Sequence, residues 1–469
     1  MKTLKNVQYE VLFQKAWENW IHGYESEAAE IWKQILISTS NENDKLIEID
    51  VINYLAMYQR VWEEKIEQVI DLKKYLDIAN DLKYTRGIAN ISIELALRSK
   101  TFERTQELFI EARRLYEEIN DRNGIMKALF LYSTYLIERG VEKFDYIFKQ
   151  LQTALELAIG ENNKFFIAQI HYAIGEAFLR LGNLHEAHHH FEISLQNFTH
   201  LGHERRSISL LVSIADVKIQ SNLENAIDEL KNSYTAFTKK LENIREKIPV
   251  FDLFYHLSRF SDLFLELEDF KQVQNLINDL EKILRQVNIE SSLYFQGKMA
   301  LAHIKGNLEL TKLNLSNASE MYNYILRRRD HARISDLYGA LISLAVISLY
   351  KYRIIFDGTF IKNAQDLVQE AIKISEATDH IKGYVRAHMV FSLLKLSIAG
   401  VNADLSEMED VIILAQEKGL HSEAKKAYQE LSRFKGIYQS QTQFFPEAHS
   451  VAEVLQYALE AKKSVKKIN

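Results

Sequence analysis

A unit of two predicted helices joined by a short break recurs along this chain, and it constrains the fold more than any other feature. Its clearest copy is HYAIGEAFLRLGNLHEAHHHFEISLQNF, residues 171–198. The apolar face of the first helix consists of Ile174, Gly175 and Phe178, and that of the second of Ala187, Phe191 and Ser194. Gly182 ends the first helix, because glycine terminates a helix at little conformational cost. The small side chains at Gly175 and Ala187 predict close packing of the two helices.

Looser copies of this unit precede and follow it at intervals of about forty residues. Near the start, the matching positions are Ala16, Gly23, Ala28, Trp32 and Ile35. The stripe of the second helix recurs at Thr105, Phe109 and Ala112, at Ala226, Leu230 and Ser233, at Val273, Ile277 and Leu280, at Thr311, Leu315 and Ala318, and at Ala364, Val368 and Ala371. We assign the breaks to Lys100, Gly140, Gly182, Ser221, Glu268 and Gly306.

The order and spacing of the landmarks in residues 171–198 resemble those of the tetratricopeptide repeat. The unit departs from that pattern at His171, where the repeat usually has tryptophan, and at Thr199, where it usually has proline. The resemblance implies an all-α fold, a right-handed superhelical solenoid of antiparallel helix pairs. The interval is longer than the ~34 residues of the standard repeat, which is typical of arrays with longer helices.

The longest interval and the loss of the period suggest three regions. Pro249 lies between the breaks at Ser221 and Glu268, and proline favours a bend or a boundary there. We therefore expect N-terminal helix pairs in 1–245 and C-terminal helix pairs in 246–433. Residues 434–469 lose the period, and Ser450-Val-Ala-Glu453 predicts the start of a final capping helix, followed by a basic tail.

Composition supports this reading and excludes several functional classes. With 47% hydrophobic residues, 26% charged residues and only 2 prolines, the chain is typical of a folded helical protein. The net charge of -6 and the absence of a basic stripe argue against nucleic-acid binding. Residues 337–350 fall short of the ~20 apolar residues that span a bilayer, so we expect a buried helix and no membrane partner. The absence of cysteine fits a reducing compartment, and we expect a cytoplasmic protein.

A helix-pair solenoid lines its concave face with first helices, and this face is where a partner is expected to bind. Carried over from the register of the best units, the resemblance implies one set of partner-binding residues: Phe13, Trp17, Trp20, Asn90, Glu94, Arg98, Lys127, Phe130, Thr134, Gln169, Tyr172, Glu176 and Arg180. Mixed aromatic and charged side chains of this kind suit a protein or peptide partner. No cofactor is expected.

One motif is typical of an enzyme. His185, Glu186 and His189 fit H-E-x-x-H, in which two histidines one helical turn apart bind zinc and the glutamate activates a water molecule. The motif falls inside the best repeat, where Ala187 already packs against the first helix. We therefore expect both histidines to project outward into solvent, and neither a third ligand nor a cleft is evident from the sequence.

The leading hypothesis is therefore a non-enzymatic scaffold or adaptor that holds a partner segment on its concave face. The alternative is a regulatory sensor, in which a peptide or small effector alters the array and thereby a separate output protein. A zinc-dependent hydrolase is a remote third possibility. The sequence leaves open the identity of the partner and whether the array self-associates.

Overall fold

The computed structural model describes most of the chain, and every regular element in the described residues is a helix. The described residues are 4–42, 44–62, 70–99, 101–139, 144–221, 225–244, 250–287, 292–329, 332, 334–378, 380–399, 406–417, 420, 423–429 and 431–432. The predicted boundary at 245/246 and Pro249 lie outside them. The predicted terminal region 434–469 also lies outside the described residues, so the division into three regions stays a prediction.

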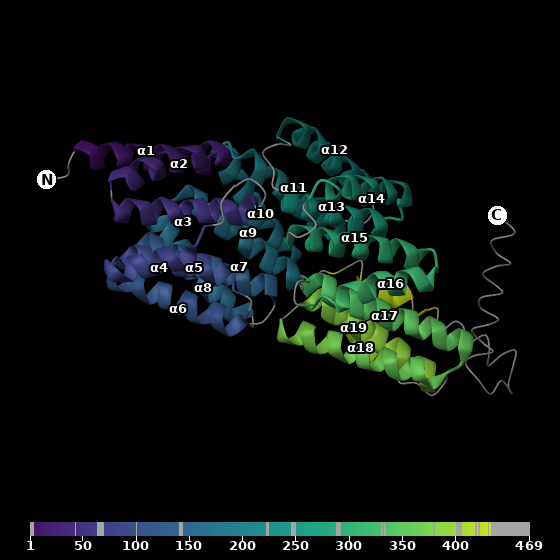
Figure 1. Ribbon diagram of the computed structural model, residues 1–469. Coiled ribbons are helices and arrows are strands. Elements are labelled where there is room, and N and C mark those ends of the chain that lie inside the picture. Colours follow the sequence, from purple (N-terminus) through teal and green to yellow (C-terminus); the bar gives the residue numbers. More distant parts are fainter. Residues whose placement is uncertain are drawn as a thin grey trace, which may run out of the picture.

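The helices follow one another as antiparallel pairs (Figure 1). The first helices of the pairs are α1 (Leu4–Ile21), α3 (Lys45–Trp62), α5 (Thr85–Leu97), α7 (Arg122–Arg139), α9 (Lys164–Arg180), α11 (Glu204–Ser221), α13 (Val250–Glu266), α15 (Ser292–Thr311), α17 (Ile334–Ile355) and α19 (Ile381–Ala399). The second helices are α2 (Glu25–Glu42), α4 (Leu72–Asp81), α6 (Phe102–Glu118), α8 (Phe144–Gly160), α10 (Leu184–His200), α12 (Ala226–Ile244), α14 (Phe270–Leu284), α16 (Leu315–Leu326), α18 (Gly358–Ala377) and α20 (Ser406–Glu417). The predicted fold class, an all-α solenoid of tetratricopeptide-like helix pairs, is confirmed.

The breaks between helices repeat one hydrogen-bonded turn. At the best unit, Gly182 has φ 70°, and the N–H of Asn183 donates to the carbonyl of Phe178 at 3.0 Å. The Asn183 side chain then accepts from the N–H of Glu186 and caps α10. Glu268, also a predicted break, has φ 60° in the same kind of turn. One left-handed residue followed by a capping side chain is therefore enough to reverse the chain.

The predicted packing of residues 171–198 is confirmed. A Cβ atom at Gly175 would lie 2.6 Å from the ring of Phe191, so only glycine permits this approach of α9 to α10. Ala187 and Phe191 are fully buried. The second-helix stripe is likewise buried at the positions Thr105, Phe109, Ala112, Val273, Ile277, Leu280, Ala318, Ala364, Val368 and Ala371.

One predicted break is wrong. Gly306 lies inside α15, and the chain reverses later, where Leu313 has φ 60°. A Cβ atom at Gly306 would lie 2.9 Å from the ring of Tyr322. Gly306 therefore has the packing role of Gly175 and not the turn role of Gly182.

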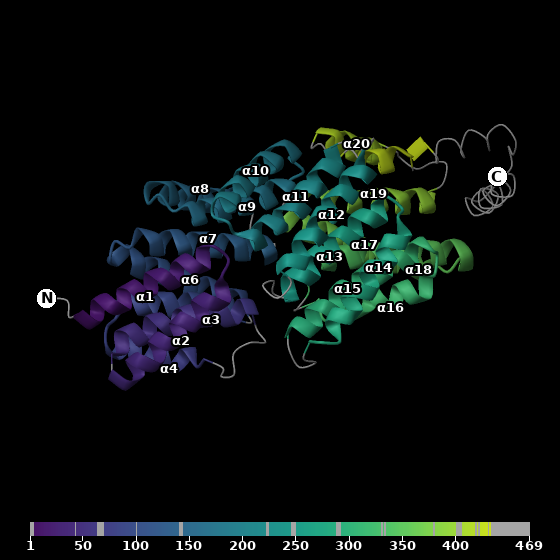
Figure 2. The same ribbon diagram turned by 90° about the horizontal axis from the view of Figure 1, so that it is seen from above.

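The array curls back on itself at its N-terminal end. In both views α1–α8 lie on one side of α9–α11 and α12–α19 on the other (Figures 1 and 2). The ring of Trp17 in α1 packs edge-on against Phe165 in α9, with centroids 6.0 Å apart. Glu25 at the start of α2 forms an ion pair with Arg205 in α11. The first pair therefore contacts units that are more than 140 residues away in the sequence.

The apolar stretch of α17 belongs to the packed array. By length and composition alone, Asp336–Ile355 is apolar enough to cross a membrane. In the structure, however, α17 lies against α15, α16, α18 and α19, and Leu341 and Ala345 are fully buried. The expectation of a buried helix is confirmed; the absence of a membrane partner stays a prediction.

Candidate functional site

The first helices from α7 to α19 enclose a cavity of about 740 Å³ in the middle of the molecule. Five of the predicted partner-binding residues lie on its wall: Thr134 in α7, and Gln169, Tyr172, Glu176 and Arg180 along one face of α9. The register therefore places these five residues on the side of their helices that faces the cavity. Their role in binding stays a prediction.

The three predicted aromatic residues of α1 do not lie on an open face. Trp20 is buried and packs against Trp32, with ring centroids 5.7 Å apart. Phe13 and Trp17 are half-buried and both contact Tyr54 in α3. These rings belong to the core because α1 lies against α3 and α9.

A similar correction applies to Asn90 and Glu94 in α5 and to Lys127 and Phe130 in α7, whereas Arg98 follows the end of α5. Glu94 is fully buried and pairs with Arg60 at 3.1 Å, and Phe130 is buried against Phe166. Asn90 accepts a hydrogen bond from Tyr116 at 2.7 Å and a longer one from Lys127. Arg98 is exposed and donates to the carbonyl of Ala56. The protein's own side chains therefore occupy most of this part of the concave face.

Arg259 in α13 organises the near wall of the cavity. Its guanidinium donates to Glu176 in α9 at 3.0 Å and to Asp216 in α11 at 2.9 Å. It also donates to the hydroxyl of Ser213, which itself donates to Glu176. One partly buried cation thus connects three successive first helices, with its charge compensated by two carboxylates.

A second charged cluster lies at the end of α13. Glu266 at the end of α13 pairs with Arg386 in α19 at 2.8 Å, and Lys382 lies 3.8 Å away. Arg386 also pairs with Glu423 at 2.7 Å. Burial raises the pKa of Glu266, but Lys382, Lys426 and Arg386 outweigh it and bring that pKa below its usual range. The carboxylate therefore stays charged and ties α19 to α13.

Buried histidines line the same cavity. His256 in α13 is hydrogen-bonded to Ser209 at 2.9 Å, and its Nδ1 atom has no hydrogen-bond partner in the described residues. Burial lowers the pKa of His256 to about 4. Burial, reinforced by Arg180, lowers the pKa of His380 to about 3. Both rings are therefore neutral at pH 7, where one ring nitrogen can donate a hydrogen bond and the other can accept one.

The residues of α11 and α13 were missed because the register was not extended beyond α9, although the signal was present. Counted from the first residue of each helix, Gln169, Ser209 and Tyr255 occupy equivalent positions. Seven residues further on, Glu176, Asp216 and Asp262 are again equivalent, and all six residues line the cavity. The α9 register therefore identifies the wall formed by the next two first helices as well.

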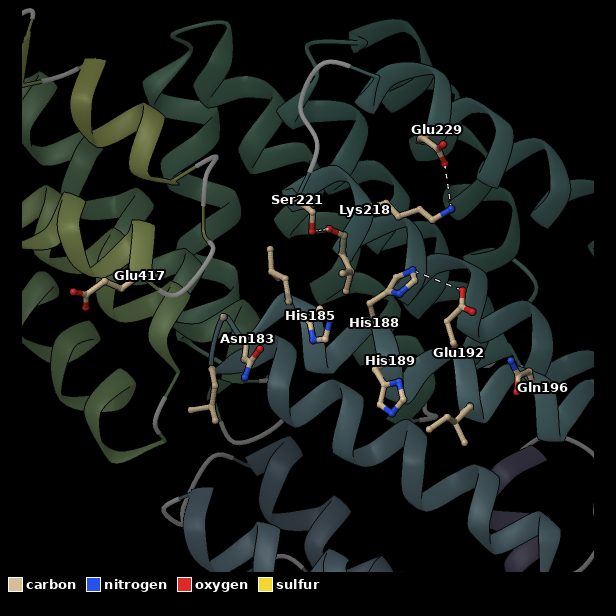
Figure 3. A pocket seen from close by; sticks show the side chains of 15 residues that line it. Asn183, His185, His188, His189, Glu192, Gln196, Lys218, Ser221, Glu229 and Glu417 are labelled. Atoms are coloured by element: carbon tan, nitrogen blue, oxygen red, sulfur yellow. Dashed lines mark hydrogen bonds and ion pairs between the residues drawn. The ribbon is translucent and has the colours of Figure 1, made fainter.

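The histidine motif lies at a different place, on the outer face. His185, whose side chain is 91% exposed, and His189 project from α10 into a surface cleft of about 1170 Å³ (Figure 3). The expected outward orientation is confirmed. His188 in the same cleft lies 3.7 Å from Glu192. In the part of the chain that the structure describes, no group of three or more metal-ligating side chains includes these residues, so the hydrolase hypothesis gains no support.

Comparisons with known proteins do not assign the chain to a family. No family model matches it, and no curated protein matches it. The Rap protein, solved in complex with competence and sporulation factor, is 12% identical with a TM-score of 0.43, and the match covers 92% of this chain and 99% of that chain. Yeast Tom70 is 11% identical with a TM-score of 0.38, and the match covers 94% of this chain and 98% of that chain. A circular tandem repeat protein is 11% identical with a TM-score of 0.18, and the match covers 97% of this chain and 98% of that chain.

Proposed function

We propose that this chain is a non-enzymatic cytoplasmic scaffold that holds a segment of a partner protein in its central cavity. The observation that carries the proposal is the convergence of successive first helices on one cavity, with the predicted residues of α9 along its wall. Helix-pair arrays use this face for binding because the second helices and the packing between units occupy the others.

The size and chemistry of the cavity favour a short extended segment over a folded domain. A volume of about 740 Å³ lies within the ~300–1,000 Å³ typical of ligand pockets. Apolar side chains such as Leu179, Ile342 and Val346 alternate on its wall with polar groups. Apolar area supplies affinity and polar groups fix the register of a bound chain.

A substitution that fills the cavity tests this proposal. Thr134 and Thr153 are both helical, and the hydroxyl of each donates to a carbonyl in the preceding turn. Thr134 lines the cavity, whereas Thr153 is exposed on α8. We would incubate the full chain with a pool of random synthetic peptides and identify the retained peptides by mass spectrometry. Thr134→Trp should abolish retention and Thr153→Trp should not; equal retention by both variants, or none by the parent chain, contradicts the proposal.

The regulatory sensor remains a second candidate because the cavity wall also holds distant helices together. Arg259 connects α9, α11 and α13, and Arg386 connects α19 to α13. An occupant that competes for these ion pairs would change the curvature of the array. Small-angle scattering with and without a retained peptide separates the two functions: a constant radius of gyration supports the scaffold, and a change of several per cent supports the sensor.

A further inference from the structure

Two arginines on the cavity wall differ from every other cation there. Arg180 donates to the carbonyl of Ile137 and forms no ion pair with any described residue. Arg206 uses only its backbone N–H, which donates to His203 at 3.4 Å, and its buried Nε atom has no hydrogen-bond partner in the described chain. Burial lowers the pKa of both arginines, and the neighbouring Arg205 lowers that of Arg206 further. Each guanidinium nevertheless remains charged at neutral pH.

The remaining cations of this region are neutralised. Arg259 pairs with Glu176 and Asp216, and Arg386 pairs with Glu266 and Glu423. Arg205, next to Arg206, pairs with Glu25 and Asp252.

The acidic side chains on the wall all have partners as well. Besides those just named, Asp262 lies 3.5 Å from His303 and accepts from Asn307, and Glu138 and Asp336 each have an interaction partner. Among the cations on the wall, Arg180 and Arg206 are therefore the two that form no ion pair with a described residue. Both are partly buried, so an occupant that supplies a carboxylate to either guanidinium gains a charge-assisted hydrogen bond.

The two arginines lie at opposite ends of successive first helices. Arg180 is the last residue of α9, and Arg206 lies in the first turn of α11. Both line the same cavity, so one occupant of the cavity has both guanidinium groups on its wall.

Building on the function proposed above, we propose that the cavity selects a short acidic peptide with two carboxylates, one of which pairs with Arg180 and the other with Arg206. One carboxylate belongs to an aspartate or glutamate side chain and the other to the peptide's C-terminus. Guanidinium groups suit this role because their planar N–H fork matches a carboxylate with two parallel hydrogen bonds.

Peptide chemistry tests the inference on the unaltered chain. The probes are N-acetylated peptides of four to six residues with one aspartate at each position in turn and a free C-terminal carboxylate. One matched set replaces aspartate by asparagine, and another ends in an amide. Each replacement should weaken binding, measured by isothermal titration calorimetry, by about ten- to thirty-fold, because it leaves a partly buried arginine without its counter-ion.

Variants then assign the two ends. Arg206→Gln should abolish the preference for one of the two carboxylates and Arg180→Gln the preference for the other. Arg104→Gln, on the exposed face of α6, should change neither. If either cavity variant fails to fold, the comparison of the peptide sets on the parent chain still decides the matter.

The outcomes separate this inference from the proposed function. Retention of neutral and acidic peptides with equal affinity by the parent chain overturns the acidic specificity and leaves peptide binding in place. Loss of every peptide overturns both. Decanedioate carries two carboxylates without amide groups; if it binds as tightly as the best acidic peptide, the ligand class is a small dicarboxylate and the peptide proposal is wrong.

Discussion

The first helices of the N-terminal units and those of the central units present similar side chains to the concave side, yet with different results. From α1 to α5 and the first half of α7, aromatic rings and ion pairs from neighbouring helices fill that side. From the second half of α7 to α19, the first helices instead enclose a cavity. The direction of a side chain is therefore set by the register of its own helix, whereas the space that it faces is set by the packing of the neighbouring helices.

Curvature accounts for the difference. In the N-terminal region the array bends tightly enough for α1 to reach α9, and Trp17 meets Phe165. In the central region, long charged side chains such as Arg259 and Arg386 instead bridge the first helices around the cavity.

The largest expected effect is a loss of stability caused by a substitution in the N-terminal region, where side chains fill the concave side. Phe130 is 6% exposed and packs edge-on against Phe166. Because Phe130→Ala leaves a cavity in a close-packed core, it should lower the free energy of unfolding by about 3–5 kcal/mol. Chemical denaturation measures this change. Ile110→Ala, on the exposed outer face of α6, serves as control and should stay within about 0.5 kcal/mol. A comparably small change for Phe130→Ala would show that α7 is not closed against α9.

The second prediction concerns acid sensitivity in the central region. The pKa of His256 is about 4 in the folded chain and 6.5 ordinarily, because burial disfavours its charged form. The unfolded chain therefore binds the proton more tightly, and stability from this residue is complete above pH ~6.5 and lost as the pH falls towards 4. The loss amounts to about 3 kcal/mol.

The variant His256→Gln tests this sign. Its hydrogen-bonding side chain does not titrate, so its unfolding free energy should depend less on pH between 7 and 4 than that of the parent. Equilibrium denaturation at several pH values gives the two slopes. Parallel slopes would mean that the pKa of His256 in the folded chain is close to its ordinary value of 6.5.

In the N-terminal region, Asp50 should give the opposite dependence of stability on pH. Burial raises the pKa of its carboxyl to about 6 from 3.8, although Tyr84 donates to both of its oxygens. The folded chain therefore binds this proton more tightly, and the contribution of Asp50 is complete below pH ~4 and lost as the pH rises to 6. Asp50→Asn keeps an acceptor for Tyr84 and should stabilise the chain at pH 8, relative to pH 4, by up to about 2 kcal/mol. A stabilisation independent of pH would contradict this assignment.

Much of the fold could be predicted because each repeat specifies its own packing. Gly175 must be small where Phe191 crosses it, and Ala187 must be small on the facing helix. These requirements act between residues that are close in the sequence, so a local pattern reveals them. Gly306 shows the limit, since a glycine satisfies either a turn or a close helix contact and the sequence does not distinguish them.

The candidate site was only partly predictable for a related reason. The register places Trp17 and Tyr172 on the same side of their helices, and that placement is local. Whether α9 then lies against Trp17, or a cavity opens before Tyr172, depends on small rotations that accumulate over several units. The unpaired state of Arg206 depends likewise on where Asp252 and Arg205 meet, 47 residues apart.

The smallest expected effect on stability gives the sharpest test of the open region. Gln169 lines the cavity and has no side-chain hydrogen bond to any described residue. Its removal in Gln169→Ala should therefore change the unfolding free energy by no more than about 0.5 kcal/mol. A peptide held in the cavity would lose one hydrogen bond worth about 0.5–1.5 kcal/mol, so its affinity should fall between two- and ten-fold. Gln152→Ala, on the exposed face of α8, should change neither quantity. If Gln169→Ala lowered both stability and affinity, this part of the wall would be packed like the N-terminal region. Only a side chain that faces open space can affect binding without affecting folding.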